Sequence, residues 1–419
     1  MARIAVVAFN LNPERNSEAQ VAAQWLKILV RSHHVEVFTD ARHREAVQRE
    51  FGDRVVCHGV GGTEPWRRLE RWLGLRGIAP MVFFRQVERR LADRARQVRF
   101  DLLHCQTPFG VHSYNRLYRV GIPMIVGPLG GGLRTPPGFA RAFRFQYLHD
   151  RLREAAYALL LKRSGWRTYL AHAERIIVGT GHVKRLLPAA LQPRCVNVFD
   201  TVVDTSVFVP APRAAHRATP RVLFVGRLES NKGPVLLLEA VRRCRARGLE
   251  GFSVELVGEG RLQGTLARLI ERYRLQDIVH LAGALSRTEV LARYRAADIF
   301  CLPTLREPGG TVILEAMACG LPVITSDYGG PAEVVTPACG IKLPMDGYDG
   351  YVAALTEALA KLLTDPACRR RMGAAGRARA TGEYSVTALE AKIGAVYRRV
   401  LPDAPSAAPI GASRRVQRL

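Results

Sequence analysis

The sequence contains no run of eighteen apolar residues, and its 8 cysteines form no C-x-x-C pair. A membrane-spanning helix needs about 20 consecutive apolar residues, so we expect no transmembrane segment. Cysteines scattered through strand-like and helix-like stretches are typical of buried free thiols in a reducing compartment. The short apolar run at residues 4–9 ends at Asn10, so we interpret it as a first strand and not as a signal peptide.

Lysine is also scarce, because it supplies only 7 of the 62 basic residues. A GC-rich genome produces such an arginine bias without selection for function. Against 37 acidic residues the formal net charge is nevertheless +25. The charge is uneven, since residues 1–200 hold 32 basic against 16 acidic residues. Nucleic-acid binding is disfavoured, because no recognised binding module accompanies the charge.

Two stretches, 65–85 and 139–167, mix arginine with tryptophan, phenylalanine and tyrosine. Tryptophan and arginine on amphipathic helices are typical of a surface that lies on a membrane. Each basic residue near an anionic leaflet adds about 1 kcal/mol of attraction. We therefore expect contact with an anionic membrane surface. The alternative is that the aromatic side chains pack inward and the arginines are merely solvated.

Strand-like runs alternate with small residues and helical runs in the second half of the chain. This repetition predicts a doubly wound parallel α/β sheet, which binds ligands at the carboxyl ends of its strands. Arg227 and Lys232 follow the first run, and two cations at that point suit a diphosphate, which arginine can hold through two donors. The runs are 221–225, 252–257, 278–282, 299–302 and 322–325.

The segment 307–315 places two carboxylates, Glu307 and Glu315, on either side of Gly309 and Gly310. Glycines let backbone N–H groups approach a ligand closely, and a helix N-terminus attracts anions. Carboxylates accept hydrogen bonds from sugar and ribose hydroxyl groups. The alternative is two solvated glutamates near a helix start, where acidic residues are common.

In order and spacing, these segments resemble the C-terminal domain of retaining GT-B glycosyltransferases of the large two-glutamate (E-x7-E) family, the family 4-like group 1 enzymes. The resemblance covers about residues 221–385, and six pieces in order are far more specific than one motif. No G-x-G-x-x-G follows the first strand, so a dinucleotide fingerprint is absent. The matching pieces are Gly226-Arg227 with Lys232-Gly233, Gly258-Glu259-Gly260, Ala297-Asp298, 307–315, 329–333 and 371–385.

The resemblance implies transfer of a sugar from a nucleotide-diphosphate donor with retention at the anomeric carbon. The sugar nucleotide would be a co-substrate and no cofactor is expected; without an Asp-x-Asp motif, no catalytic metal is expected either. Alternatively, the glycines serve tight packing. The implied catalytic residues are Arg227, Lys232 and Glu307. The implied donor-binding residues are Glu315, Gly226, Gly258, Gly260, Ala284, Leu285, Gly309, Gly310, Thr311 and Val312.

The N-terminal half repeats the strand and helix pattern, with strands expected at 3–8, 35–39, 101–105, 122–126 and 175–178. The resemblance implies two Rossmann-like domains facing each other across a cleft. We expect an acceptor-binding domain at 1–205 and a donor-binding domain at 206–385. A helix at 386–401 should return to the first domain, and residues 402–419 should form a disordered tail.

The chain departs from the family pattern in the acceptor half. Many members carry a histidine just after the strand that here ends at Gly127, and this chain has glycines there. Backbone amides of the glycines could act instead, or His104 could substitute, although His104 could equally be a packed strand-end residue. Gly309 stands where an aromatic residue is usual. The expected cleft residues of this half are Ser17, His104, Gly130, Gly131 and Gly132.

The resemblance, together with the expected membrane surface, therefore implies a retaining, metal-independent hexosyltransferase that acts on a glycan or lipid-linked acceptor at the cytoplasmic membrane face, in polysaccharide or glycolipid biosynthesis. Two alternatives stay open. One is a GT-B nucleotide-sugar epimerase, and the other is a non-catalytic sugar-nucleotide-binding scaffold or partner subunit, which the missing histidine would favour. The sequence alone does not identify the nucleobase, the sugar, the acceptor or the oligomeric state.

Overall fold

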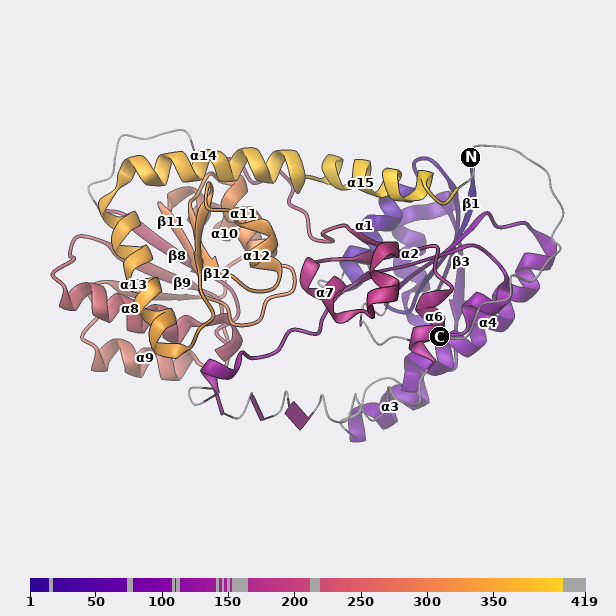
Figure 1. Ribbon diagram of the computed structural model, residues 1–419, viewed down its shortest axis with the longest axis horizontal. Helices are drawn as coiled ribbons and strands as arrows, with labels where there is room; N and C mark the ends of the chain where they lie inside the picture. Colours follow the sequence, from indigo (N-terminus) through magenta and orange to yellow (C-terminus); the bar gives the residue numbers. More distant parts are fainter. Residues whose placement is uncertain are drawn as a thin grey trace.

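Two α/β domains lie side by side in the computed structural model (Figure 1). Each domain is a parallel sheet with helices packed on it, so the predicted pair of doubly wound domains is confirmed. The structure describes residues 1–14, 18–73, 78–107, 110, 114–140, 143–144, 147–148, 151–152, 165–211 and 219–401. Ser17 and the expected tail at 402–419 lie outside the described residues.

The N-terminal domain has a 7-stranded sheet in the order β3-β2-β1-β4-β5-β6-β7. The strand order reverses between β1 and β4, where doubly wound sheets open their ligand crevice. The strands are β1 (Arg3–Ala8), β2 (His34–Asp40), β3 (Val55–Val60), β4 (Leu102–Thr107), β5 (Met124–Leu129), β6 (Arg175–Val178) and β7 (Cys195–Asn197). The helices are α1 (Glu18–Leu29), α2 (Arg44–Phe51), α3 (Glu64–Leu73), α4 (Ile78–Gln97), α6 (Trp166–Ala171) and α7 (Gly181–Leu186).

The C-terminal domain has a 6-stranded sheet in the order β10-β9-β8-β11-β12-β13. Its strands are β8 (Arg221–Val225), β9 (Ser253–Val257), β10 (Val279–Gly283), β11 (Ile299–Leu302), β12 (Val323–Ser326) and β13 (Gly340–Leu343). Its helices are α8 (Pro234–Ala246), α9 (Gln263–Arg272), α10 (Arg287–Ala296), α11 (Thr311–Ala318), α12 (Gly330–Val334), α13 (Tyr348–Thr364), α14 (Pro366–Glu383) and α15 (Val386–Arg398).

All ten strands that the sequence predicts are present, and the three that it misses, β3, β7 and β13, lie at sheet edges. Central strands such as β1 and β11 are buried on both faces, which gives them continuous apolar runs. The edge strands are less regular: Val56 and His58 of β3 are exposed or half-buried, and Lys342 interrupts β13. Their apolar pattern is therefore too weak to separate them from loops.

Helix α15 leaves the C-terminal domain and packs on the N-terminal one (Figure 1). Ser385 caps it by accepting a hydrogen bond from the Ala388 amide at 3.2 Å. Its apolar face is buried in the N-terminal core beside β1, β2 and α1. This face consists of Leu389, Ile393, Val396 and Tyr397.

His104 joins α15 to the centre of the N-terminal sheet. Its ring is 0% exposed, its Nε2 donates to the Gly127 carbonyl at 2.8 Å, and its Nδ1 accepts from the Tyr397 hydroxyl at 2.5 Å. Burial lowers the pKa of His104 to about 4, which keeps the ring neutral in this arrangement. His104 is thus the packed strand residue that the sequence analysis kept as its alternative, and its ring does not face the cleft.

Replacing Tyr397 with phenylalanine should destabilise the docking of α15. The change leaves the buried Nδ1 of His104 with only the amide of Gln106, at 3.4 Å, as a neighbouring donor. We expect a loss of about 1–2 kcal/mol, measured as a melting temperature lower by a few degrees. Tyr118→Phe, which changes a half-buried tyrosine of the same domain, is the control and should leave the melting temperature unchanged. Equal melting temperatures for Tyr397→Phe and the parent would contradict this role.

Candidate functional site

The loops after β8, β9 and β10 meet at the carboxyl edge of the C-terminal sheet. A Cβ atom on Gly258 would lie 2.1 Å from the Gly226 carbonyl oxygen, and one on Gly260 would lie 2.4 Å from that of Leu228. The Gly258 amide donates to the Gly283 carbonyl at 2.8 Å. Glycine at 258 and 260 is therefore required by loop packing, which was the alternative to ligand contact.

Backbone contacts draw the loop after β8 against the loop after β11. The Asn231 carbonyl accepts from the Leu305 amide at 2.9 Å and from the Thr304 hydroxyl at 2.8 Å. Gly233 has φ +74°, and a Cβ there would lie 2.0 Å from the Pro303 carbonyl oxygen. Only glycine satisfies both conditions. The two loops are thus held together, and Lys232 comes to lie beside Glu307.

The ammonium group of Lys232 contacts the Oε2 atom of Glu307. Their side chains are only 17% and 11% exposed, so the pair is largely shielded from water. Oε1 of Glu307 accepts from the amides of Gly310 at 3.1 Å and Gly309 at 3.3 Å. The sequence analysis placed Gly310 among the donor-binding residues; in the structure its amide holds Glu307. Thr311 and Val312 open α11, where first-turn amides have no partner within the helix.

Glu315 lies in the second turn of α11 and is half-buried. Its Oε2 accepts from the hydroxyl of Tyr294 at 3.0 Å, and that hydroxyl lies 3.2 Å from the Val312 carbonyl. Burial raises the pKa of Glu315 to about 6, although the Tyr294 hydrogen bond acts in the opposite direction. A shielded carboxylate held by one fixed donor can accept further hydrogen bonds from a pair of hydroxyl groups.

The remaining predicted residues of this domain lie along the same edge. Arg227 and Ala284 are exposed and Leu285 is half-buried. Arg227 directly follows Gly226, whose amide donates to the Val257 carbonyl at 3.0 Å. The structure therefore brings Arg227, Lys232, Glu307 and the start of α11 to one edge of the sheet, on neighbouring loops.

The glycines after β5 lie beside His182, which contacts the C-terminal domain. Gly131 and Gly132 are exposed and have φ angles of +86° and +73°. Gly132 presents its carbonyl to Nε2 of His182 at 3.5 Å. The ring of His182 in turn meets the ring of Tyr328, from the C-terminal domain, edge-on at 5.4 Å. Burial lowers the pKa of His182.

Sequence reasoning missed three residues of this site: Tyr294, Tyr328 and His182. Tyr294 is 0% exposed and looks like an ordinary core residue of α10, so only the fold reveals its bond to Glu315. Tyr328 adjoins the matching piece 329–333, and that position was the available signal. His182 lies in the first turn of α7, shortly after the strand β6. No motif in the neighbouring sequence marks it as a site residue.

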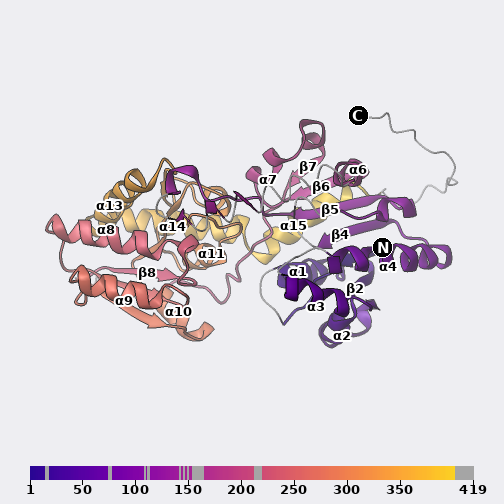
Figure 2. The same cartoon turned by 90° about the horizontal axis from the view of Figure 1, so that it is seen from below.

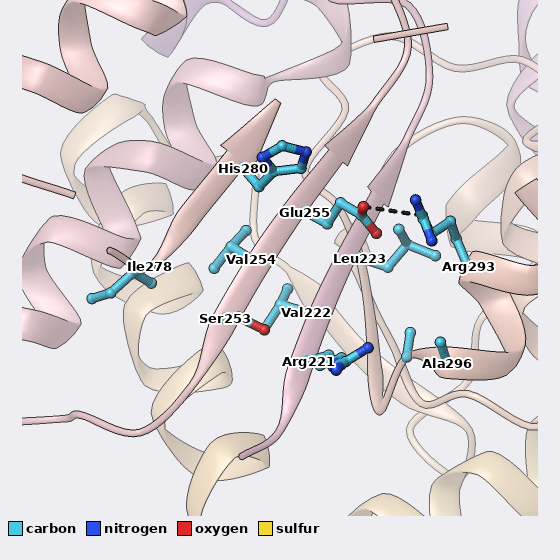
Figure 3. A pocket seen from close by; sticks show the side chains of 11 residues that line it. Arg221, Val222, Leu223, Ser253, Val254, Glu255, Ile278, His280, Arg293 and Ala296 are labelled. Carbon is cyan, nitrogen blue, oxygen red and sulfur yellow. Dashed lines mark ion pairs between the residues drawn. The ribbon is translucent and has the colours of Figure 1, made fainter. Parts of the chain in front are cut away.

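A separate hollow of about 250 Å³ lies over the amino-terminal ends of β8, β9 and β10 (Figure 3). Glu255 and Arg293 form an ion pair across it at 3.0 Å. The carboxyl ends of these strands, where the predicted residues gather, lie at the opposite edge of the sheet. The hollow is therefore not part of the site. Its other polar lining residues are Arg221, Ser253 and His280.

Replacing Glu315 with glutamine should stabilise the protein at neutral pH. Below pH 4.5 the carboxyl is protonated in both folded and unfolded chains; above its folded pKa of about 6, the folded protein must bear a shielded charge. The parent therefore loses about 2 kcal/mol as pH rises through this window, and the variant does not. The melting temperature of the variant should exceed that of the parent at pH 7.5 and equal it at pH 4.5.

The exposed Glu271→Gln change on α9 is the control for that comparison and should shift neither melting temperature. A difference between Glu315→Gln and the parent that is the same at both pH values would contradict the burial argument.

Residues 212–379 match the model of the family described as glycosyl transferases group 1. The chain is 34% identical over 264 residues to a D-inositol 3-phosphate glycosyltransferase of Kineococcus radiotolerans, covering 55% of this chain and 58% of that protein. It is 37% identical over 200 residues to a GDP-mannose-dependent monoacylated alpha-(1-6)-phosphatidylinositol monomannoside mannosyltransferase of Corynebacterium glutamicum, covering 44% and 51%. The chain thus spans about half the length of the curated relatives it matches.

Solved structures extend the similarity to the whole fold. A glycosyltransferase from Rickettsia africae aligns over 96% of this chain and 99% of its own, with a TM-score of 0.64 and 17% identity. Anabaena HepE, in complex with UDP, aligns over 95% and 100%, with a TM-score of 0.61 and 15% identity. The chain has the GT-B fold of these proteins, and its residues 212–379 are similar to the glycosyl transferases group 1 family.

Proposed function

We propose that this protein transfers a sugar from a nucleotide-diphosphate donor to a hydroxyl group of a glycan or lipid-linked acceptor, with retention at the anomeric carbon. One observation carries the proposal. Within a group 1 domain, Lys232, Glu307 and the start of α11 gather at the carboxyl ends of β8 and β11, and Glu315 lies in the second turn of the same helix.

Retention follows when bond making and bond breaking take place on one face of the sugar. The bond between the anomeric carbon and the diphosphate oxygen breaks, and the acceptor oxygen bonds to the same carbon from the same side. The acceptor proton passes to the departing diphosphate. No residue needs to form a covalent intermediate, so the task of the protein is to stabilise charge on the leaving group.

The site residues suit this division of labour. Arg227 and Lys232 supply positive charge for the diphosphate, and the amides that open α11 add donors at a helix N-terminus. Glu307, already fixed by two glycine amides, is the acceptor for hydroxyl groups of the transferred sugar. Glu315 accepts from the ribose. The loops that carry Gly226, Gly258, Gly260, Ala284 and Leu285 lie against the nucleotide.

We also propose that the reaction needs no divalent metal. Among the residues that the structure describes, no three His, Cys, Asp or Glu side chains gather into a possible metal site. The two cations of the β8 loop supply the charge that a metal would otherwise provide. This proposal predicts that glycosyl transfer continues when a chelator such as EDTA is present.

The acceptor side favours an amphiphile at an anionic membrane, in polysaccharide or glycolipid synthesis at the cytoplasmic face. Trp72 on α3 is 81% exposed, and Trp66 on α3 and Met81 on α4 are 42% and 46% exposed. Arg68, which lies between the two tryptophans in the sequence, has a side chain that is 75% exposed. Exposed tryptophan beside arginine is the composition of a membrane-resting helix. In Figure 2, which looks from below, α3 lies on the near side of the molecule.

None of the helices in the described ranges is long and apolar enough to cross a membrane. Surface contact through α3 is therefore the mode of association that we propose. The acylated phosphatidylinositol mannoside in the name of the Corynebacterium relative illustrates the kind of lipid-linked acceptor that such a surface would serve.

The donor should be found by thermal shift of the purified protein against UDP-, GDP-, ADP- and dTDP-sugars, with EDTA present. A ligand that binds only the folded protein must raise its melting temperature. We expect a shift with one donor class. Lys232→Ala and Glu315→Ala should weaken its binding about 10- to 100-fold, because each removes a charged group that hydrogen-bonds to the ligand.

Lys361→Ala, on the exposed face of α13, is the matched control and should bind as the parent does. The absence of a shift with every donor, in folded protein, would count against a catalytic site and in favour of a scaffold role. Breakdown or isomerisation of the donor without transfer would instead identify an epimerase or a hydrolase.

The double change Trp66→Ala and Trp72→Ala should abolish most binding to vesicles of phosphatidylglycerol and phosphatidylcholine. We expect the bound fraction to fall about tenfold, because the apolar surface that enters the headgroup region is lost. High salt should weaken binding of the parent through its arginines. Val56→Ala, another exposed apolar side chain of the same domain, is the control. Unchanged sedimentation of the double variant with vesicles would exclude α3 as the contact.

A further inference from the structure

A segment of the N-terminal half crosses the cleft and inserts into the C-terminal domain. Phe139 is 0% exposed within the C-terminal core, and its ring meets that of Tyr351 edge-on at 5.4 Å. A Cβ atom on the preceding Gly138 would lie 2.7 Å from the Cα atom of Gly347. In both Figure 1 and Figure 2 the purple chain near residue 140 lies against the C-terminal domain. We call residues 133–139 the strap.

The first residues of the strap, Leu133 and Arg134, contact the turn 328–330. The Arg134 amide donates to the Tyr328 hydroxyl at 3.0 Å. A Cβ atom on Gly329 would lie 2.9 Å from Cδ1 of Leu133, so the leucine side chain packs directly on this turn. His182 adds its ring to Tyr328 from the same domain as the strap. The turn is thus held from the N-terminal side at three points.

The turn 328–330 in turn supports the backbone that carries Glu307. The Gly330 amide donates to the Glu307 carbonyl at 2.8 Å. A Cβ atom on Gly330 would lie 2.4 Å from the Pro308 carbonyl oxygen, and one on Gly329 would lie 2.6 Å from that of Glu307. Any movement of Tyr328 is therefore passed to Glu307 through close backbone contact, without an intervening flexible side chain.

Glu315 has a different support. Its partner Tyr294 belongs to α10 of the same domain. The two glutamates of one motif are thus held independently, Glu315 within the C-terminal domain and Glu307 in part by the other domain.

We propose that Tyr328 and Leu133 are positioning residues for Glu307, through which the strap couples domain docking to the sugar-holding half of the donor site. The nucleotide half, around Glu315, is complete within the C-terminal domain alone. The inference rests on the proposed function for the identity of the ligand, but the mechanical coupling itself does not need a ligand. It follows that a loosened strap changes recognition of the sugar and leaves recognition of the nucleotide as it is.

Tyr328→Phe and Leu133→Ala test the coupling, because each loosens the turn without removing a group from the cores of the two domains. Phe139→Ala is less suitable, since it opens a cavity in the C-terminal core. Tyr348→Phe, a half-buried tyrosine on α13, is the matched control. The first readout is amide hydrogen exchange in the absence of ligand. Peptides that cover 307–312 should exchange about 3- to 10-fold faster in both test variants and at the parent rate in the control.

The second readout is the affinity of each variant, by calorimetry, for UDP, GDP, ADP and dTDP and for a sugar conjugate of each. Both test variants should bind the free nucleotide as the parent does and its sugar conjugate about 3- to 10-fold more weakly, which is the loss of one hydrogen bond or its equivalent in packing. Unchanged exchange at 307–312 overturns the inference, whatever the protein binds. Equal weakening of nucleotide and sugar nucleotide also overturns it. A parent that binds neither class, with faster exchange in the variants, overturns the proposed function and leaves the coupling supported.

Discussion

Lys232 and Glu307 stand 75 positions apart in the chain, and their charged groups meet where β8 and β11 end. A pair so shielded is stable only when its remaining hydrogen-bonding positions are satisfied, since two charges lose their hydration together. The two glycine amides satisfy one oxygen of Glu307, and the Asn231 contacts hold the loop of Lys232. The neighbouring glycines follow from the same constraint, because a side chain at 233 would force the two loops apart.

The other elements of the structure hold the loops of Lys232 and Glu307 in place. The order β10-β9-β8-β11-β12-β13 places β8 and β11 side by side at the centre of the sheet, so their loops open at the same edge. Two segments then bind the domains to each other. Helix α15 carries the chain from the C-terminal domain onto the N-terminal core, and the strap carries Phe139 in the opposite direction. The turn 328–330, which contacts the strap, packs against the backbone of Glu307.

Periodicity and glycine placement were enough to predict the domains and the central strands, because buried parallel strands are apolar on both faces. The family resemblance assigned Lys232, Glu307 and Glu315 to one site, and the structure brings Lys232 and Glu307 into direct contact. The sequence could not predict contacts between residues that lie far apart in the chain and belong to no recognisable motif. Nothing local marks Phe139 as a core residue of the other domain. Similarly, the amide of Gly310 turned toward Glu307 because the carboxylate lies within the same tight turn.

The most direct test of this account is a crystal structure of the protein with the sugar nucleotide that it binds. The account predicts the diphosphate against Lys232 and the first amides of α11, the ribose hydroxyls on Glu315, and the sugar hydroxyls on Glu307. A nucleotide bound instead in the hollow between Glu255 and Arg293, or a diphosphate with no contact to Lys232, would contradict it.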